Sequence, residues 1–145
     1  MANTLFSDSI QIMAYIAFHP HQPVSSKALA KSVLTNPGRI RRIMAKLKSA
    51  GLIHSYQGKP HACLAKPASA ISLRDIYLAV LGGQMLLKVD TNTSPNCEIG
   101  IHISKVLASY YLKIQAEVEN KLDQTTLEDL VADLKLKESR QATEK

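Results

Sequence analysis

The sequence predicts a mainly α-helical protein with one small β-hairpin and a long C-terminal helix, and three observations support this fold class. Apolar residues recur at helical spacing over most of the chain. Between residues 52 and 65 the pattern changes to two short strand-like runs around a turn. From about residue 98 to residue 122 an apolar stripe continues without a proline. These features indicate a helical domain that contains a hairpin and is followed by an extended helix.

The size and composition of the chain fit one globular domain with an appendage. Its 145 residues are 46% hydrophobic, which suffices for a proper core and argues against extended disorder. No apolar run reaches the ~18 residues of a membrane span, and the N-terminus lacks a secretory pattern. The two cysteines, Cys63 and Cys97, are too few for a disulfide framework. We therefore expect a cytoplasmic protein without a membrane partner.

The net charge of +6 is distributed unevenly along the chain. Residues 1–66 contain nine Lys/Arg and a single acid, Asp8, whereas residues 67–145 contain nine Lys/Arg and eleven acids. The first part therefore carries +8 and the second part −2. A basic N-terminal half is typical of a module that binds a polyanion, and the mildly acidic half is then available for regulation or assembly.

Two helices are expected before the most basic stretch. Residues 5–18 form the first, and apolar residues such as Ile12 widen its hydrophobic surface, so we expect it to be covered on two sides. A second, short helix is expected at 25–34, with either Ser25 or Ser26 as its N-cap. A tight turn then leads into the next helix.

The helix at 36–51, NPGRIRRIMAKLKSAG, is apolar on one side and strongly basic on the other. Asn36 can cap its first turn, Pro37 suits the first helical position, and Gly51 can adopt the left-handed conformation that ends a helix. Its buried side is expected to consist of the apolar residues at helical spacing, Ile40, Ile43, Met44 and Leu47. The opposite side combines arginines with small residues, which suits a helix that enters a DNA major groove; an ordinary solvated basic face is the alternative.

A β-hairpin is expected immediately after this helix. The runs 52–56 and 62–65 flank a turn-rich tip at 57–61. Two helices joined by a tight turn, the second of them basic, and a following hairpin form a winged helix-turn-helix. Lys59 and His61 at the tip of the wing are then expected to contact the DNA backbone or the minor groove.

Residues 1–82 together are expected to form this DNA-binding domain. Its last helix begins at Ser72, whose hydroxyl can form a capping box with Asp75. A loop or linker is expected at 83–97, because residues 90–96, DTNTSPN, strongly favour turns.

The segment 98–136 is expected to hold the protein together as a homodimer. A long helix at about 98–122 carries an apolar stripe that is too long to bury against a small domain, and the same helix of a second chain would cover it; packing within the chain is the alternative. The stripe consists of Ile99, Ile103, Val106, Leu107, Tyr110, Ile114 and Val118. A short helix opened by a capping box of Thr125 and Glu128 follows, and residues 137–145 are expected to be a disordered polar tail.

The residues that contact DNA are expected on the helix-turn-helix and the wing. Arg42 points most directly away from the predicted core, so it is our candidate for reading a guanine edge, whereas Arg39, Arg41 and Lys46 are expected to bind phosphates. The full set of candidates is Ser26, Thr35, Asn36, Gly38, Arg39, Arg41, Arg42, Lys46, Lys59 and His61. A dimer would present two such helices to successive major grooves ~34 Å apart.

The run VSSKALAKSVLTNPGRIRRIMAKLKSAGLIHSYQGKPHACLAKPASAISLRDIYLAV resembles the Rrf2 family of winged-helix transcriptional repressors. The resemblance covers about residues 5–122 and includes the segments SSKALA, KLKSAGLI, LAKPASAISLRDIY and the later NCEIG. It implies a bacterial homodimer whose recognition helices and wings bind a palindromic operator, with crossed long helices holding the dimer. Repression, rather than activation, is implied by this resemblance alone.

The cysteines of the chain depart from the family pattern. Cluster-sensing members place three cysteines around the loop before the long helix to ligate an iron–sulphur centre, and residues 84–102 here contain only Cys97. We therefore expect no iron–sulphur cluster and no other metal or cofactor. Some cluster-free members sense oxidants through a thiol at a corresponding place, which makes Cys97 a candidate redox or effector site. The alternative is a small buried residue without a signalling role.

Two further classes of function are alternatives to a transcriptional regulator. A winged helix can also act as a protein- or RNA-binding adaptor without operator specificity, although the basic helix argues against the protein version. An enzyme with Cys97 as nucleophile would need a neighbouring base, and the sequence places none beside it. The prediction is a non-enzymatic regulator that binds double-stranded DNA as a homodimer, with an oxidant or small molecule as candidate effector.

Overall fold

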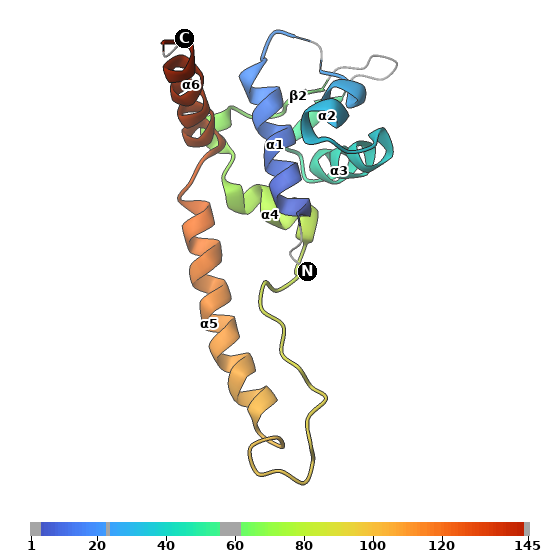
Figure 1. The fold of residues 1–145 in the computed structure, drawn as a ribbon, viewed down its shortest axis with the longest axis vertical. Helices are drawn as coiled ribbons and strands as arrows, with labels where there is room; N and C mark the ends of the chain where they lie inside the picture. Colours follow the sequence, from blue (N-terminus) through green and yellow to red (C-terminus); the bar gives the residue numbers. More distant parts are fainter. Residues whose placement is uncertain (1–3, 23, 56–61, 144–145) are drawn as a thin grey trace.

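The computed structural model describes residues 4–22, 24–55 and 62–143, which are mainly α-helical with one two-stranded antiparallel sheet. The elements are α1 (Leu5–Phe18), α2 (Ser26–Val33), α3 (Pro37–Ser49), β1 (Ile53–Ser55), β2 (Ala62–Leu64), the 3-10 helix η1 (Ala68–Ala70), α4 (Leu73–Leu81), α5 (Ile103–Asp123) and α6 (Leu127–Thr143). Figure 1 shows α1 to α4 and the sheet gathered into one domain, from which α5 projects. The predicted fold class, mainly α with a small hairpin in a winged helix-turn-helix domain, is confirmed. None of the described helices is long and apolar enough to span a membrane.

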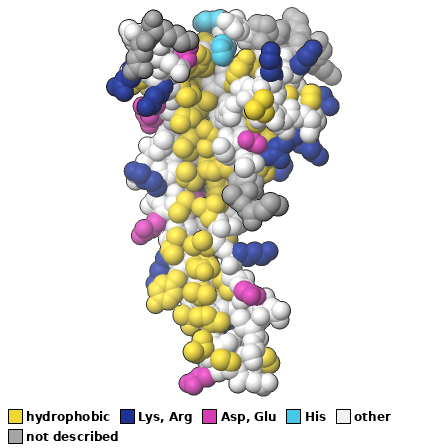
Figure 2. Space-filling view, viewed as in Figure 1, with side chains coloured by type: hydrophobic (Ala, Val, Ile, Leu, Met, Phe, Trp, Pro, Cys, Tyr) yellow, Lys and Arg dark blue, Asp and Glu magenta, His cyan; other side chains and the backbone are white. Residues whose placement is uncertain are grey.

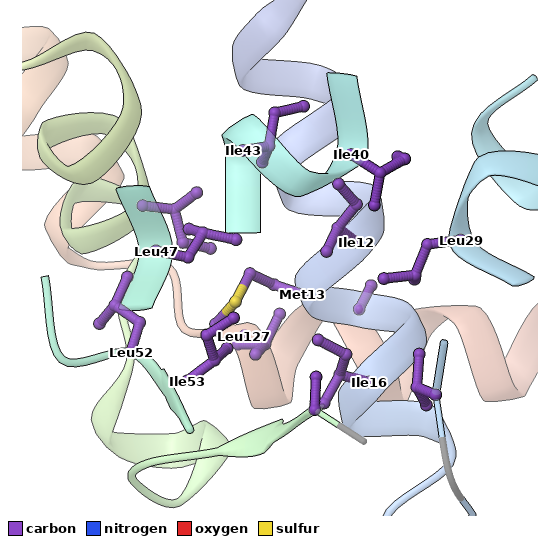
Figure 3. Close-up of a cluster of buried hydrophobic side chains, with 14 of the residues drawn as sticks. Ile12, Met13, Ile16, Leu29, Ile40, Ile43, Leu47, Leu52, Ile53 and Leu127 are labelled. Carbon is purple, nitrogen blue, oxygen red and sulfur yellow. The ribbon is translucent and has the colours of Figure 1, made fainter. Parts of the chain in front are cut away.

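Helix α1 lies at the centre of the domain and packs against α2, α4, β2 and α6. Ile12 and Met13 of α1 are fully buried, and Figure 3 shows them among apolar side chains from α2, α3 and the strand segment. Burying one such side chain contributes about 1.5–3 kcal/mol. The prediction that the first helix is covered on more than one side is confirmed. Helix α3 packs against α2, α4 and β1, and the ion pair between Arg39 and Asp8 joins it to α1.

Three of the helices of the domain begin with the caps that the sequence indicates. Ser25, and not Ser26, caps α2, and Asn36 caps α3; each side-chain oxygen accepts from the backbone N–H three residues on, at 3.1 and 2.8 Å. Ser72 and Asp75 form the expected capping box at α4, with reciprocal bonds of 3.1 and 2.9 Å. Such caps each contribute about 1 kcal/mol and fix where the helices begin.

The turn between α2 and α3 depends on Leu34 in a left-handed conformation, with φ 58° and ψ 52°. Its side chain is 89% exposed, so no burial offsets the ~1–2 kcal/mol that an L-residue loses in this region. At the other end of α3, Gly51 has a φ of +75°, which confirms the predicted glycine stop.

Helix α6 is longer than expected. It continues to Thr143, so residues 137–143 are helical where a disordered polar tail was predicted, and residues 144–145 lie outside the described ranges. The segment KESRQA consists mostly of good helix formers, which the prediction from polarity undervalued. In this last turn the Thr143 hydroxyl donates to the backbone oxygens of Ser139 and Arg140.

The capping box of α6 lies one residue later than expected. Thr126 and Asp129 exchange the two bonds, at 3.0 and 3.1 Å, in place of the predicted pair Thr125 and Glu128. The backbone carbonyl of Thr125 is instead engaged by the N–H of Leu73 at 2.9 Å. This bridge to the start of α4 determines which of two overlapping capping motifs is used.

Helix α6 packs into the same core as α1. Leu127 is fully buried and Val131 nearly so, and Figure 3 shows Leu127 in the cluster that also contains Met13 and Ile53. The sequence predicts this helix as part of the dimerisation segment 98–136. In the structure α6 instead completes the core of the winged-helix domain, and the segment between α4 and α6 is an insertion.

We call residues 84–123 the arm, which consists of a loop that runs out from α4 and of α5, which returns (Figure 1). Helix α5 begins at Ile103, about one turn later than predicted, because residues 95–102 form consecutive turns. Gly100 permits this geometry, since a Cβ there would lie 2.7 Å from the backbone oxygen of Ser94. The arm holds most of the exposed large apolar side chains of the described chain.

Candidate nucleic-acid interface

Helix α3 is fixed by its apolar side, which leaves its basic side in solvent. Ile40, Ile43 and Leu47 are buried against the core, and Met44 is half-buried. Burial of this side sets the rotation of the helix about its axis, and the cap at Asn36 and the stop at Gly51 set where the helix begins and ends. The predicted orientation of the helix is therefore the one observed.

Arg41 and Arg42 are exposed cations of α3 that make no side-chain hydrogen bond within the described residues, as is Lys48 near the C-terminal end of the helix. Both are exposed, and neither takes part in an ion pair among the described residues. Guanidinium groups in this state can hold a guanine edge or a phosphate bidentately. Figure 2 shows Lys and Arg side chains along the outside of the domain rather than over the apolar band of the arm.

Arg39 and Lys46 are instead engaged within the domain. Arg39 donates to the carboxylate of Asp8 on α1 at 2.9 Å, with side-chain exposures of 32% and 21% for the pair. Lys46 donates to the backbone oxygen of Val80 at the end of α4, at 3.3 Å. A phosphate contact by either residue would have to share or replace these bonds, so their predicted role as phosphate ligands stays a prediction.

Ser26, Thr35 and Gly38 are positioned by local packing. The Ser26 hydroxyl lies 3.8 Å from the sulfur of Met44, which ties the start of α2 to α3. Thr35 is half-buried in the turn. At Gly38 a Cβ would come within 3.1 Å of the capping oxygen of Asn36, so this glycine leaves room for the cap.

The wing is described only at its base. Strands β1 and β2 pair with His54 opposite Cys63, and this alternation places Ile53 and Ala62 in the core. Lys59 and His61, the predicted contacts at the tip, lie outside the described residues. Cys63 is half-exposed and lines a groove of about 440 Å³ between the end of α1 and β2.

The predicted dimer stripe follows the outer side of the arm. Its largest exposures are Ile99 at 71% and Tyr110 at 59%, with Val106 and Ile114 also exposed. Ile103, Leu107 and Val118 are half-buried, because they border the side of α5 that packs on the rest of the chain. Figure 2 shows the apolar side chains as one continuous band along the arm.

Cys97 lies at the tip of the arm and is exposed, so the burial assumed in the alternative is wrong, whereas its signalling role stays a prediction. The backbone N–H groups of Gly100 and then Ile99 lower the pKa of its thiol, by stabilising the thiolate more than partial desolvation disfavours it. The turns before α5 thus present to solvent a thiol whose pKa is lowered.

Sequence reasoning missed a polar cluster between α4 and the arm. The buried Gln115 bonds to Tyr77 at 2.8 Å and to the backbone N–H of Leu86 at 3.0 Å, and Glu119 and Arg74 extend the cluster to the surface. The sequence pattern that could have indicated this cluster is the position of Gln115, a polar residue between Tyr111 and Val118 on an otherwise apolar side of α5.

The described residues do not fit an iron–sulphur cluster or another multi-ligand metal site. Among them no group of three or more His, Cys, Asp or Glu side chains is placed to hold a metal ion. Cys97 is at the arm tip, whereas Cys63 is in β2 of the domain, well away from it (Figure 1).

Comparison with known proteins places these features in a family. The sequence pattern of the Rrf2 family, described as an iron-dependent transcriptional regulator, matches residues 2–133. The chain belongs to the Rrf2 family of transcriptional regulators. It is similar to the Bacillus subtilis (strain 168) protein named "Putative HTH-type transcriptional regulator YwnA", with 34% identity over 131 residues that cover 90% of this chain and 97% of the relative.

Solved structures of Rrf2 regulators share the fold. IscR of T. potens is 26% identical, with a TM-score of 0.68 over 92% of this chain and 88% of that chain. CymR (YrzC), the global cysteine regulator of B. subtilis, is 24% identical, with a TM-score of 0.67 over 91% and 96% of the two chains. The resemblance to the Rrf2 family drawn from the sequence is confirmed. As a member of this family, the chain is a DNA-binding transcriptional regulator rather than an enzyme.

Proposed function

We propose that this Rrf2 protein binds a palindromic operator as a homodimer and represses transcription in the cytoplasm by occluding the promoter. The observation that carries the proposal is α3, which buries its apolar side and leaves Arg41 and Arg42 exposed without an ion pair among the described residues. Two guanidinium groups on one exposed helical surface suit base-edge and phosphate recognition in a major groove.

The homodimer is supported by the apolar band of the arm. Helix α5 already uses one side to pack on its own domain, and the stripe around Tyr110 lies beside that side, exposed in the single chain. An exposed apolar surface of this length is uncommon on a monomer and marks an interaction site. A second copy offers the same surface, as a twofold interface requires.

Selection of bound duplexes from a random pool tests the proposal as a whole. A palindromic consensus with two half-sites is expected, and in vitro transcription from a promoter that overlaps this consensus should fall as the protein is added. Binding of single-stranded RNA with equal affinity, or selection of no consensus, would contradict operator recognition and favour an adaptor.

Replacement of Arg42 tests the base-reading assignment. Arg42→Ala is expected to cost about 1–3 kcal/mol on the selected operator and to relax the preference at one position of each half-site. Lys48→Ala, on the same helix, removes an exposed cation that we do not place at the bases and serves as control. Unchanged selectivity of the Arg42 variant would reject the assignment.

Replacement of Tyr110 tests the dimer. Tyr110→Asp places a charge in the apolar stripe and should shift the mass measured by sedimentation from dimer to monomer. Leu112 is equally exposed but lies about 200° around the helix from Tyr110, so Leu112→Asp is the matched control and should leave the dimer intact. Equal effects of both substitutions would contradict a dimer built on the stripe.

We further propose that oxidation of the Cys97 thiol modulates operator binding. The support is its exposure at the arm tip together with the lowered pKa caused by the Gly100 and Ile99 N–H groups. Treatment with peroxide should change the affinity of the wild-type protein for its operator and should leave Cys97→Ser unaffected. An equal response of both proteins would remove Cys97 as the sensor.

A further inference from the structure

A chain of polar contacts connects α4, α5 and the outgoing loop of the arm. Gln115 is at its centre and is only 7% exposed. Its amide oxygen accepts from the N–H of Leu86 at 3.0 Å, and its amide nitrogen donates to Tyr77 at 2.8 Å and to Glu119 at 3.3 Å. The Tyr77 hydroxyl in turn donates to the backbone oxygen of Gln84 at 2.6 Å.

These hydrogen bonds pair the buried side-chain groups of Tyr77 and Gln115 and the N–H of Leu86, which would lose their partners if α5 shifted on α4. Tyr77 is 1% exposed, and its ring packs edge-on against Phe6 of α1 at 5.4 Å, so its hydroxyl is held at one place in the domain. An unpaired buried amide or hydroxyl is costly, and hydrogen bonds are directional, whereas apolar contacts tolerate sliding. The cluster therefore specifies one position of α5 on α4.

Helix α5 is attached to α4 at a second point, near its C-terminal end. There the Ser72 hydroxyl donates to Asp123 at 3.2 Å, and the N–H of Leu73 donates to the oxygen of Thr125 at 2.9 Å. Gln115 and Asp123 are eight residues apart, which is about 12 Å along a helix. Two attachment points at this separation fix the direction of the arm. Without Gln115, the contacts that remain are the end point and the more exposed ion pair between Arg74 and Glu119, at 3.6 Å.

The direction of the arm governs where the recognition helices of a dimer lie. Helix α5 has 21 residues and is therefore about 31 Å long. A tilt of about 6° at its attachment would move the far end by about 3 Å, which is close to the ~3.4 Å rise of one base pair. A small change in the tilt of α5 at Gln115 thus corresponds to a shift of about one base pair in the distance between the two recognition helices on DNA.

We infer that Gln115, held by Tyr77, is a positioning residue that sets the half-site spacing this protein accepts. The inference rests on the proposed binding of an operator by a homodimer and assigns to that function a residue that belongs neither to the candidate DNA contacts nor to the dimer stripe. Recognition of a single half-site by α3 is independent of it, because α3 is attached to α1 and α4 through other residues.

The test measures binding to duplexes that carry two copies of the half-site, with the spacing varied one base pair at a time around one helical turn (~10.5 bp). The wild-type protein is expected to show one sharp optimum. Gln115→Leu keeps the size of the side chain and removes its hydrogen bonds. In this variant, the factor by which affinity falls when the spacing differs by one base pair from the optimum should shrink about fivefold. This change lies within the range known for residues that modulate coupling between sites. Affinity for a single half-site and the dimeric mass should stay unchanged.

Gln124→Leu is the matched control, because it makes the same exchange at the exposed C-cap of α5, where no side-chain bond is formed within the described residues. Should Gln115→Leu fail to fold, Tyr77→Phe removes a single oxygen and is expected to broaden the optimum in the same direction. An unchanged spacing profile, or a loss of affinity that is equal at every spacing, would overturn the inference. If the wild-type protein bound the half-site but showed no spacing optimum, the proposed dimeric mode would fail together with it.

Discussion

The ion pair between Asp8 and Arg39 predicts that removing an acid will strengthen DNA binding. Asp8 is the single acidic residue of the basic half of the chain, and it holds the guanidinium of Arg39 at 2.9 Å beside the start of α3. In Asp8→Ala this guanidinium is released next to the end of α3 that we propose approaches DNA. We expect higher affinity for duplex DNA at a modest cost in stability.

The magnitude follows from the exposure of the pair and from counterion release. With 32% and 21% exposure, the pair is worth about 0.5–1 kcal/mol, and the loss of an acid from the first turn of α1 adds about 0.3–1 kcal/mol. One additional phosphate contact makes the slope of log K against log salt more negative by about 0.9. The gain in affinity should therefore be about 3.5-fold larger at 50 mM than at 200 mM salt.

The assay is a fluorescence-anisotropy titration of one operator duplex at several salt concentrations. Arg39→Gln and the double variant Asp8→Ala/Arg39→Gln complete the set, and these two proteins should bind equally, since Asp8 acts only through Arg39. Lower affinity of Asp8→Ala at every salt concentration, or an unchanged slope, would refute the reasoning and show that the pair serves only to orient α3.

Three further substitutions or treatments have defined outcomes. Leu34→Gly should raise the free energy of unfolding by about 0.5–1 kcal/mol because it relieves the left-handed strain, while Leu34→Ala should bring no gain in the same denaturant titration. Leu127→Ala should lower the free energy of unfolding by about 2–5 kcal/mol, as for other fully buried leucines, and a loss below 1 kcal/mol would contradict the burial of α6 in the core. In a Cys63→Ala background, alkylation of Cys97 by iodoacetamide should continue at lower pH than alkylation of a free cysteine (pKa ~8.5), because the lowered pKa retains thiolate as the pH falls; a rate profile equal to that of free cysteine would contradict the backbone stabilisation.

Features fixed by neighbouring residues could be predicted from the sequence. The cap at Asn36, the proline that follows it and the stop at Gly51 depend on contacts within one turn, and all three agree with the structure. The buried side of α3 followed from its apolar period in the same way. This local information is what orients Arg41 and Arg42 outward.

Features that depend on distant contacts could not be predicted. The pairing of Asp8 with Arg39 joins residues 31 positions apart, and the role of Gln115 depends on Tyr77, 38 positions away. The overlapping motifs of Thr125 and Thr126 are equivalent in sequence, and the backbone bridge to α4 decides between them. The amphipathic pattern of α6 shows that one side is buried but not that its partner is α1.

Because α6 packs on the domain formed by α1 to α4, the order of translation affects when that domain can fold. Because Leu127 and Val131 belong to the core built on α1, the DNA-binding domain is discontinuous in the chain, and the arm is made before the domain can close. On the ribosome, a nascent chain that ends at Leu81 would have its recognition helix but an incomplete core. The apolar band of the arm would emerge while that core is still open, so that the domain folds fully only once α6 has been translated.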